Sequence, residues 1–136
     1  ALRDRLREVR VFGGDWSRVL TRGMTYHGNA VAVFLDPPYA GDVRSAGLYR
    51  EDGADVAESV RAWAIEHGND PRFRIALCGY ENEHGDAMPN AWSVHQWSSG
   101  GGFGASVGSR GRDNAKQERI WFSPHCLPLT GSLFDE

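Results

Sequence analysis

The sequence has little cysteine, no long apolar run and no strong excess of either charge. Cys78 and Cys126 lie far apart and form no Cys-x-x-Cys pair. No metal site is therefore expected, and the thiols are typical of a reduced cytoplasmic protein. No run approaches the roughly 18 apolar residues of a membrane span. The charged first residues lack the apolar core of a secretion signal. A net charge of −3 argues against a uniformly basic protein that coats nucleic acid, although a local basic face stays compatible.

What the chain does contain suits one globular domain over residues 1–136. Its 136 residues are too few for two comfortable domains, and 40% hydrophobic with 24% charged residues is ordinary for a packed core. The chain begins with Ala inside a helical pattern, and we interpret it as a piece of a longer protein.

Apolar spacing predicts strands that alternate with helices. Residues 30–35 form a continuous apolar run, which predicts a central strand buried on both faces. Asp52 or Asp55 is expected to cap the next helix and Gly68 to end it. Parallel βαβ units followed by an antiparallel edge hairpin indicate an α/β, Rossmann-like fold. Further strands are predicted over 9–12, 74–80, 92–97 and 119–122, and short helices near 2–9 and from Asp15 or Ser17 to Leu20.

An Asp36-Pro37-Pro38-Tyr39 tetrapeptide follows the apolar run directly. Methylation of an exocyclic amine needs two acceptors on its N–H bonds, which free the lone pair. A carboxylate and a backbone carbonyl can provide them, and proline fixes the backbone while offering only its carbonyl. An aromatic ring can hold the base by stacking. Open α/β sheets bind ligands at the carboxyl ends of their strands. A simple strand terminator is the plainer interpretation, but the placement after a buried strand favours function.

Four segments together resemble the D12 class of adenine-specific DNA methyltransferases, particularly its phage and prophage members. The segment with residues 32–39 is specific, and those with residues 9–16, 74–80 and 118–124 are supportive. The resemblance implies a Rossmann-like methyltransferase fold, S-adenosylmethionine as methyl donor and a flipped adenine of double-stranded DNA as acceptor. It also implies that Asp36 and Pro37 contact N6, that Tyr39 stacks on the base, and that Asp15, Trp16 and Asp36 contact the donor.

The chain departs from this family at its start. An F-x-G-x-G donor motif and an acidic ribose-binding residue are expected there, and nothing before Val9 provides either. The fold is therefore expected to be partial, with an exposed apolar strand edge that favours a homodimer or another chain. A truncated, non-catalytic remnant or partner subunit that binds DNA or protein is the alternative function. Cytosine N4, RNA bases and protein glutamine amides are alternative methyl acceptors.

Weaker features concern the Gly-rich and Ser-rich stretch between the last two strands. Residues 100–108 do not fit F-x-G-x-G, and we interpret them as a hairpin loop. Arg110, Arg112 and Lys116 are candidate DNA contacts, with a solvated loop as the equal alternative. Glu81 and Glu83 follow a strand end and could line a cleft. His84, His95 and His125 show no ligand spacing and are expected to be structural or exposed, and the tryptophans other than Trp16 are expected in the core.

Overall fold

A computed structural model describes residues 2–7, 9–21, 30–38, 53–96 and 117–128. The chain forms two compact units, residues 1–31 and residues 32–136, and each is described by itself. Among the described residues, no helix is long and apolar enough to cross a membrane. The expectation of a single domain over residues 1–136 stays a prediction.

The first unit contains two short helices and no strand among its described residues before Val31. α1 spans Leu2–Leu6 and the 3-10 helix η1 spans Trp16–Arg18. Asp15 caps η1, as predicted, but the helix expected to reach Leu20 is a single turn. The strand predicted over residues 9–12 is not formed, and Val9, Val11 and Phe12 are more than half exposed. A strand needs a hydrogen-bonded neighbour, and no described residue pairs with this segment.

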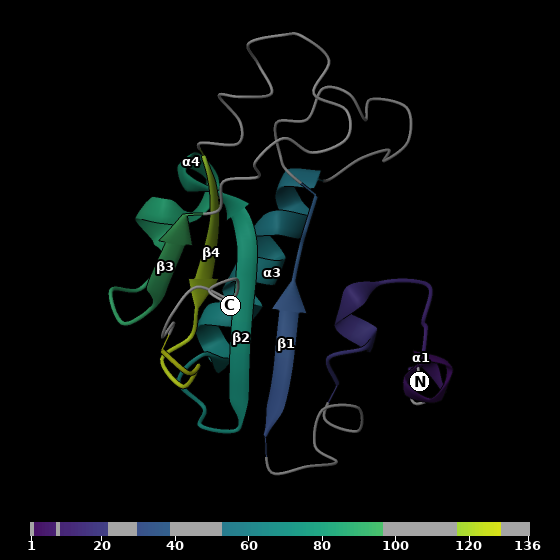
Figure 1. Ribbon diagram of the computed structural model, residues 1–136. Coiled ribbons are helices and arrows are strands. Elements are labelled where there is room, and N and C mark those ends of the chain that lie inside the picture. Colours follow the sequence, from purple (N-terminus) through teal and green to yellow (C-terminus); the bar gives the residue numbers. More distant parts are fainter. Residues whose placement is uncertain (1, 8, 22–29, 39–52, 97–116, 129–136) are drawn as a thin grey trace, which may run out of the picture. The chain divides into compact units, whose positions relative to one another are not determined.

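The second unit is built on a four-stranded sheet with the order β1-β2-β4-β3 (Figure 1). The strands are β1 Val31–Leu35, β2 Phe73–Tyr80, β3 Ser93–Gln96 and β4 Glu118–Phe122. β1 and β2 run in the same direction, whereas β4 is antiparallel to both β2 and β3. The sheet is therefore mixed, and the predicted α/β class and the antiparallel hairpin at its edge are confirmed.

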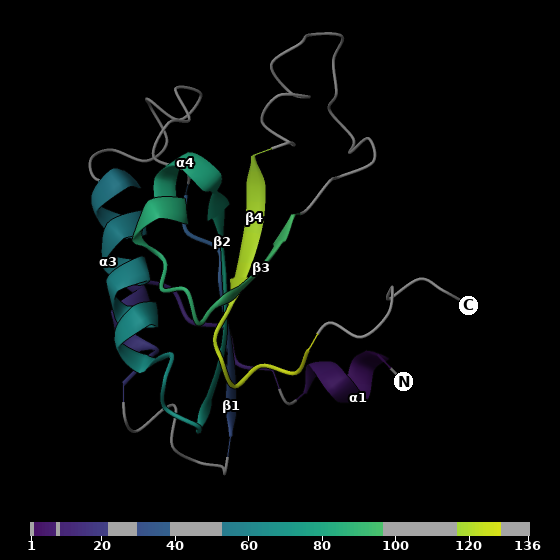
Figure 2. The ribbon, with the colours of Figure 1, turned by 90° about the vertical axis from the view of Figure 1, so that its left-hand side faces the viewer.

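α3, Gly53–His67, connects β1 to β2 and covers one face of the sheet (Figure 2). Ala57, Val60 and Ala64 are its buried side chains, spaced three and four residues apart as one helical stripe requires. On β2, Phe73, Ile75 and Leu77 alternate with half-buried residues and are almost fully enclosed. Each such side chain contributes about 1.5–3 kcal/mol by leaving water. This stripe and these alternating residues form the core.

α3 ends where the sequence predicts. Gly68 follows it, and the indole of Trp92 lies so close that a Cβ at Gly68 would come within 2.4 Å of it. Trp92 and Trp121 are buried, as expected for the core, whereas Trp63 is half-buried. Trp97 lies outside the described residues.

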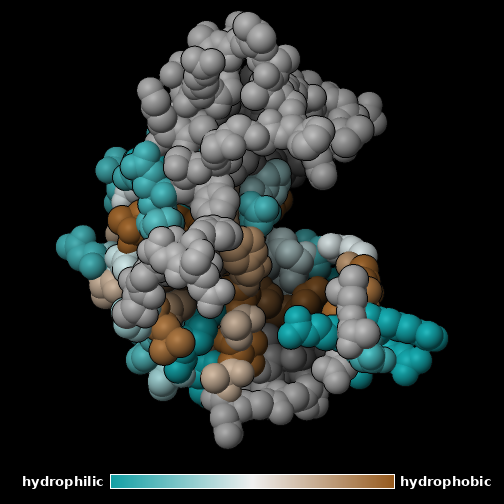
Figure 3. Space-filling model, in the orientation of Figure 1, coloured by the Kyte–Doolittle hydropathy of each residue, from teal (hydrophilic) through white to brown (hydrophobic). Residues whose placement is uncertain are grey.

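β1 does not have the predicted central position. It is the outermost strand of the described sheet, and its burial alternates: Val33 and Leu35 are buried while Phe34 is 66% exposed. A strand buried on both faces needs a layer on each side. Among the described residues of this unit, a helix covers only the α3 side, and apolar side chains reach the surface on the other (Figure 3).

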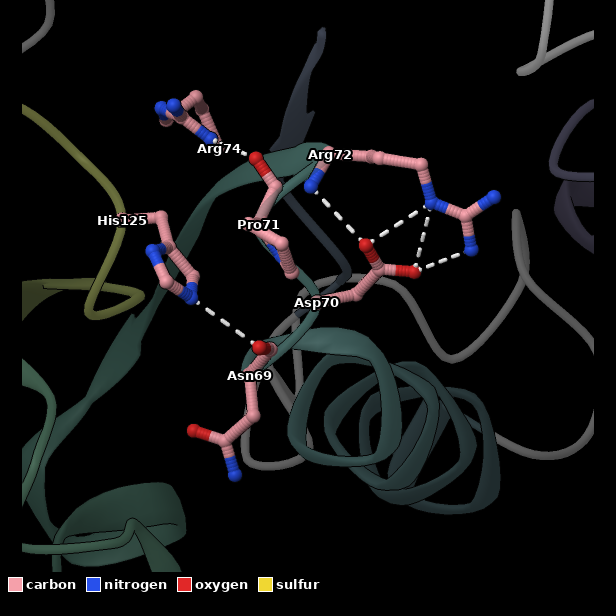
Figure 4. A network of polar contacts seen from close by, with 6 residues as sticks. All are labelled: Asn69, Asp70, Pro71, Arg72, Arg74 and His125. Carbon is pink, nitrogen blue, oxygen red and sulfur yellow. Dashed lines mark hydrogen bonds and ion pairs between the residues drawn. The ribbon is translucent and has the colours of Figure 1, made fainter.

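The start of β2 is fixed by a polar network at the end of the sheet remote from Asp36 (Figure 4). The Asp70 carboxylate accepts hydrogen bonds from the Arg72 backbone N–H and guanidinium, and these bonds lower the pKa of Asp70 to about 2. His125 Nε2 lies 3.0 Å from the Asn69 carbonyl oxygen. Ser123 extends the β2–β4 ladder, because its N–H donates to the Ile75 carbonyl at 2.9 Å. This end of the sheet is a structural anchor.

Candidate functional site

The carboxyl ends of β1 and β2 and the start of β4 meet at one edge of the sheet (Figure 1). Asp36 follows β1 directly, and Tyr80, the last residue of β2, pairs with Glu118, the first of β4. Parallel strands connected by a helix bring their carboxyl ends together, which is where open α/β sheets hold ligands. Asp36, Pro37 and Pro38 therefore lie at the edge where open α/β sheets hold ligands, as their position after a strand predicted.

Asp36, Pro37 and Pro38 differ in exposure. Pro37 is buried, whereas Asp36 and Pro38 on either side of it are exposed. Asp36 forms no hydrogen bond or ion pair with any other described residue. A buried proline ring has a fixed φ and no N–H to satisfy, so it anchors the backbone while the neighbouring carboxylate stays accessible. Among the described residues, nothing occupies the Asp36 oxygens.

Cys78 on β2 lies beside this carboxylate. Burial raises the pKa of the Cys78 thiol to about 11, and the negative charges of Asp36 and then Glu118 add to the effect. The thiol is therefore protonated at neutral pH and is a poor nucleophile. The strand order places the end of β1, the end of β2 and the start of β4 next to one another, so the charges of Asp36 and Glu118 both act on this thiol.

α4, Glu81–His84, follows β2 at the same edge and continues into the 3-10 helix η3, Gly85–Ala87. The sequence analysis predicted no helix here. The first turn is fastened to β4, because the Glu81 carboxylate pairs with Arg119 at 2.9 Å and the Glu81 N–H donates to the Gln117 carbonyl. Glu83 Oε2 lies 3.4 Å from the Tyr80 N–H and caps the turn. Both glutamates at the strand end thus stabilise the first turn of α4.

His84 is a residue of this edge whose importance the sequence did not reveal. It is one of the expected structural histidines, but it is almost fully buried, at 1% exposure. Burial, followed by the positive charge of Arg61, lowers the pKa of its imidazole to about 4. His95, by contrast, is exposed and His125 half-buried. No spacing within the sequence separates these three cases, since His84 is enclosed by residues of β2, β4 and α3.

The candidate donor contacts Asp15 and Trp16 belong to the first unit. One oxygen of the Asp15 carboxylate accepts hydrogen bonds from the Ser17 hydroxyl and N–H, which lower the pKa of Asp15. The other oxygen has no hydrogen bond to a described residue, and Trp16 is half-buried. The strand and helix that would flank a glycine-rich donor loop are not present among the described residues before β1.

The remaining predicted site residues lie outside the described residues. These are Tyr39 and the candidate DNA contacts Arg110, Arg112 and Lys116. The chain enters residues 39–52 from the end of β1, and it enters and leaves residues 97–116 at the end of β3 and the start of β4. All three of these ends lie at the Asp36 edge (Figure 1).

Within the described ranges, no three His, Cys, Asp or Glu side chains group in a way that could hold a metal ion. No family model, curated protein or solved structure matches the chain.

Proposed function

We propose that the chain is the amino-group-binding part of an S-adenosylmethionine-dependent DNA adenine-N6 methyltransferase. The observation that carries the proposal is the combination at the end of β1. An accessible carboxylate, Asp36, with no other hydrogen bond among the described residues, is followed by a proline anchored in the protein interior.

The chemistry required of these residues is modest. Asp36 and the Pro37 carbonyl each accept a hydrogen bond from one N–H group of the amine. These two bonds draw N6 toward tetrahedral geometry and expose its lone pair. Tyr39 stacks on the extruded base. The donor, when bound, supplies a methyl group already activated by a sulfonium charge. The N6–CH₃ bond forms as the S–CH₃ bond breaks, and the proton lost from N6 leaves through the solvent-exposed Asp36 carboxylate.

DNA is the proposed partner of residues 39–52 and 97–116, which follow or connect strand ends at this edge. The segment 97–116 contains Arg110, Arg112 and Lys116 and one acidic residue, in a chain whose net charge is −3. Basic residues that flank a base-binding site can pair with backbone phosphates on either side of an extruded nucleotide. The three residues are therefore proposed as phosphate contacts, with Tyr39 and Asp36 on the base.

The testing experiment is transfer of tritium from labelled S-adenosylmethionine to duplex DNA. We expect Asp36→Ala to lose at least about a hundredfold in rate, since it removes one of the two amine acceptors. Glu58→Ala is the matched control, because it removes an exposed carboxylate of α3, and it should retain full activity. Equal incorporation by the native chain and Asp36→Ala would remove Asp36 from the mechanism.

The edge position of β1 supports a second candidate. In a doubly wound sheet the ligand site lies where the two halves of the sheet adjoin, and β1 has a neighbour on only one side among the described residues. In this alternative the chain is a non-catalytic partner subunit or remnant that binds DNA or another protein. Calorimetry with S-adenosylmethionine separates the two, because micromolar binding by this chain alone would contradict the partner hypothesis.

A further inference from the structure

Arg61 of α3 makes two contacts with α4. Its Nη1 donates a hydrogen bond to the Glu83 carbonyl oxygen at 2.6 Å and lies 3.3 Å from Nδ1 of His84. A guanidinium has donors and no acceptor. Nδ1 must therefore be the unprotonated, accepting nitrogen, and the proton of the neutral imidazole is on Nε2.

The His84 ring is closely packed against two neighbours, Trp121 and Gly79. It lies edge-on to Trp121, with ring centroids 5.5 Å apart at 87°. It also covers Gly79 so closely that a Cβ there would come within 2.1 Å of His84 Cδ2. Nε2 is buried and has no hydrogen-bond partner among the described residues. A second proton would go on Nδ1, which faces the Arg61 guanidinium, so these surroundings favour the neutral ring.

The charged groups around the ring oppose its protonation. α3 presents the Arg61 guanidinium, and β2 and β4 present the uncharged Gly79 and Trp121. The acidic groups of α4 are directed elsewhere: Glu81 pairs with Arg119 of β4, and Glu83 caps the turn at Tyr80. In η3, Asp86 is exposed. These surroundings account for the low pKa of the imidazole, about 4.

We propose that Arg61 and His84 form a pH-sensitive latch, which fastens α4 to α3 while His84 is neutral and releases it when acid protonates the ring. A proton on Nδ1 removes the acceptor and puts two cations in contact. The ring must then leave Gly79, and α4 loses its contacts with Arg61 of α3, while its first turn stays attached to Gln117 and Arg119. Because α4 follows β2 at the edge where Asp36 lies, its release changes the surroundings of the candidate site. The latch goes beyond the proposed methyl transfer and does not depend on it.

The test follows the His84 ring and the α4 amides by NMR of the labelled full chain from about pH 7 to about pH 3.5. We expect the neutral tautomer with its proton on Nε2 to persist to near pH 4. Hydrogen exchange should show the amides of residues 82–88 losing protection at a higher pH than those of β2. Loss of α4 and β2 protection at the same pH would overturn the latch, and so would titration of His84 with α4 protection unchanged.

Two variants separate the latch from a merely structural contact. Gly79→Ala places a Cβ where the ring lies and should release α4 at neutral pH, with no further pH-dependent loss of its protection. Arg61→Gln removes the cation and its two contacts with α4, so α4 protection should already be weaker at neutral pH. The further rise in α4 amide exchange in acid should be smaller, by about tenfold for each pH unit by which the pKa of His84 rises. An unchanged α4 protection profile in both variants would overturn the proposal.

Discussion

The Asp36 carboxylate lies close enough to the Cys78 thiol to raise its pKa, although the two residues belong to different strands. This proximity fixes the end of β1 beside the end of β2 and defines the edge at which the candidate site is built. It also provides a chemical probe of the site that needs no substrate.

Asp36→Asn should make Cys78 more reactive at a given pH. Burial is the largest cause of the raised pKa of Cys78, so removing the Asp36 charge should lower the pKa only part of the way back. The pH dependence of iodoacetamide alkylation measures this, since the thiolate is the reacting form. A Cys126→Ser background leaves Cys78 as the only thiol and keeps a hydroxyl near the Ile75 carbonyl. Identical profiles with Asp and Asn would contradict the neighbouring placement.

Folding stability should fall in mild acid because of His84. Its pKa is about 4 in the folded chain against 6.5 ordinarily, so only the unfolded chain takes up a proton between these values. The contribution of neutral His84 to the free energy of unfolding is fully present above pH 6.5. Up to about 3 kcal/mol of it is lost as the pH falls to 4.

Urea unfolding of the native chain and of His84→Gln at about pH 7 and about pH 4.5 measures that contribution. The native chain should lose more free energy of unfolding between the two conditions than the variant. Asp70 does not interfere, because its lowered pKa affects stability only below 3.8. The same pH dependence in both proteins would show that His84 is not held neutral.

Gly68→Ala should destabilise the chain by about 1–3 kcal/mol, because the added methyl group would collide with Trp92 at the end of α3. Gly13→Ala is the matched control, since nothing lies within 4 Å of a Cβ there. Thermal unfolding compares the two. Equal melting temperatures for both variants would contradict the close packing of Trp92 on the helix end.

Association of the chain should depend on Phe34. This side chain is 66% exposed on β1, the outermost described strand, and residues 31–35 contain no charge or proline that would discourage strand pairing. Phe34→Lys should reduce dimers or larger species in light scattering while changing stability by less than about 0.5 kcal/mol. A native chain that is strictly monomeric at high concentration would contradict the exposed edge.

Local patterns predicted most of the described elements of the second unit. The expected cap at Asp52 or Asp55 and the Gly68 stop predicted α3, and apolar runs predicted β1 and β2 to within a residue or two. The position of Asp36 at a strand end was equally accessible, because it needs only the sequence on either side.

Relations between distant segments were not accessible in this way. The six apolar residues before Asp36 fit a central strand, but burial on both faces depends on layers that the run itself does not specify. His84 is enclosed because the β2–β4 register places Trp121 next to Leu77, close to Gly79, and α3 brings Arg61 to the same place. Val9–Phe12 has strand composition, but no described residue pairs with it.

The most direct test of the central claim is mass spectrometry of nucleosides from duplex DNA incubated with the chain and S-adenosylmethionine. The proposed hydrogen bonds from the adenine amino group to Asp36 and Pro37 predict N6-methyladenine from the native chain. They also predict about a hundredfold less product, or lower still, with Asp36→Ala. No N6-methyladenine from a chain that binds the donor, or equal amounts from both proteins, would contradict it.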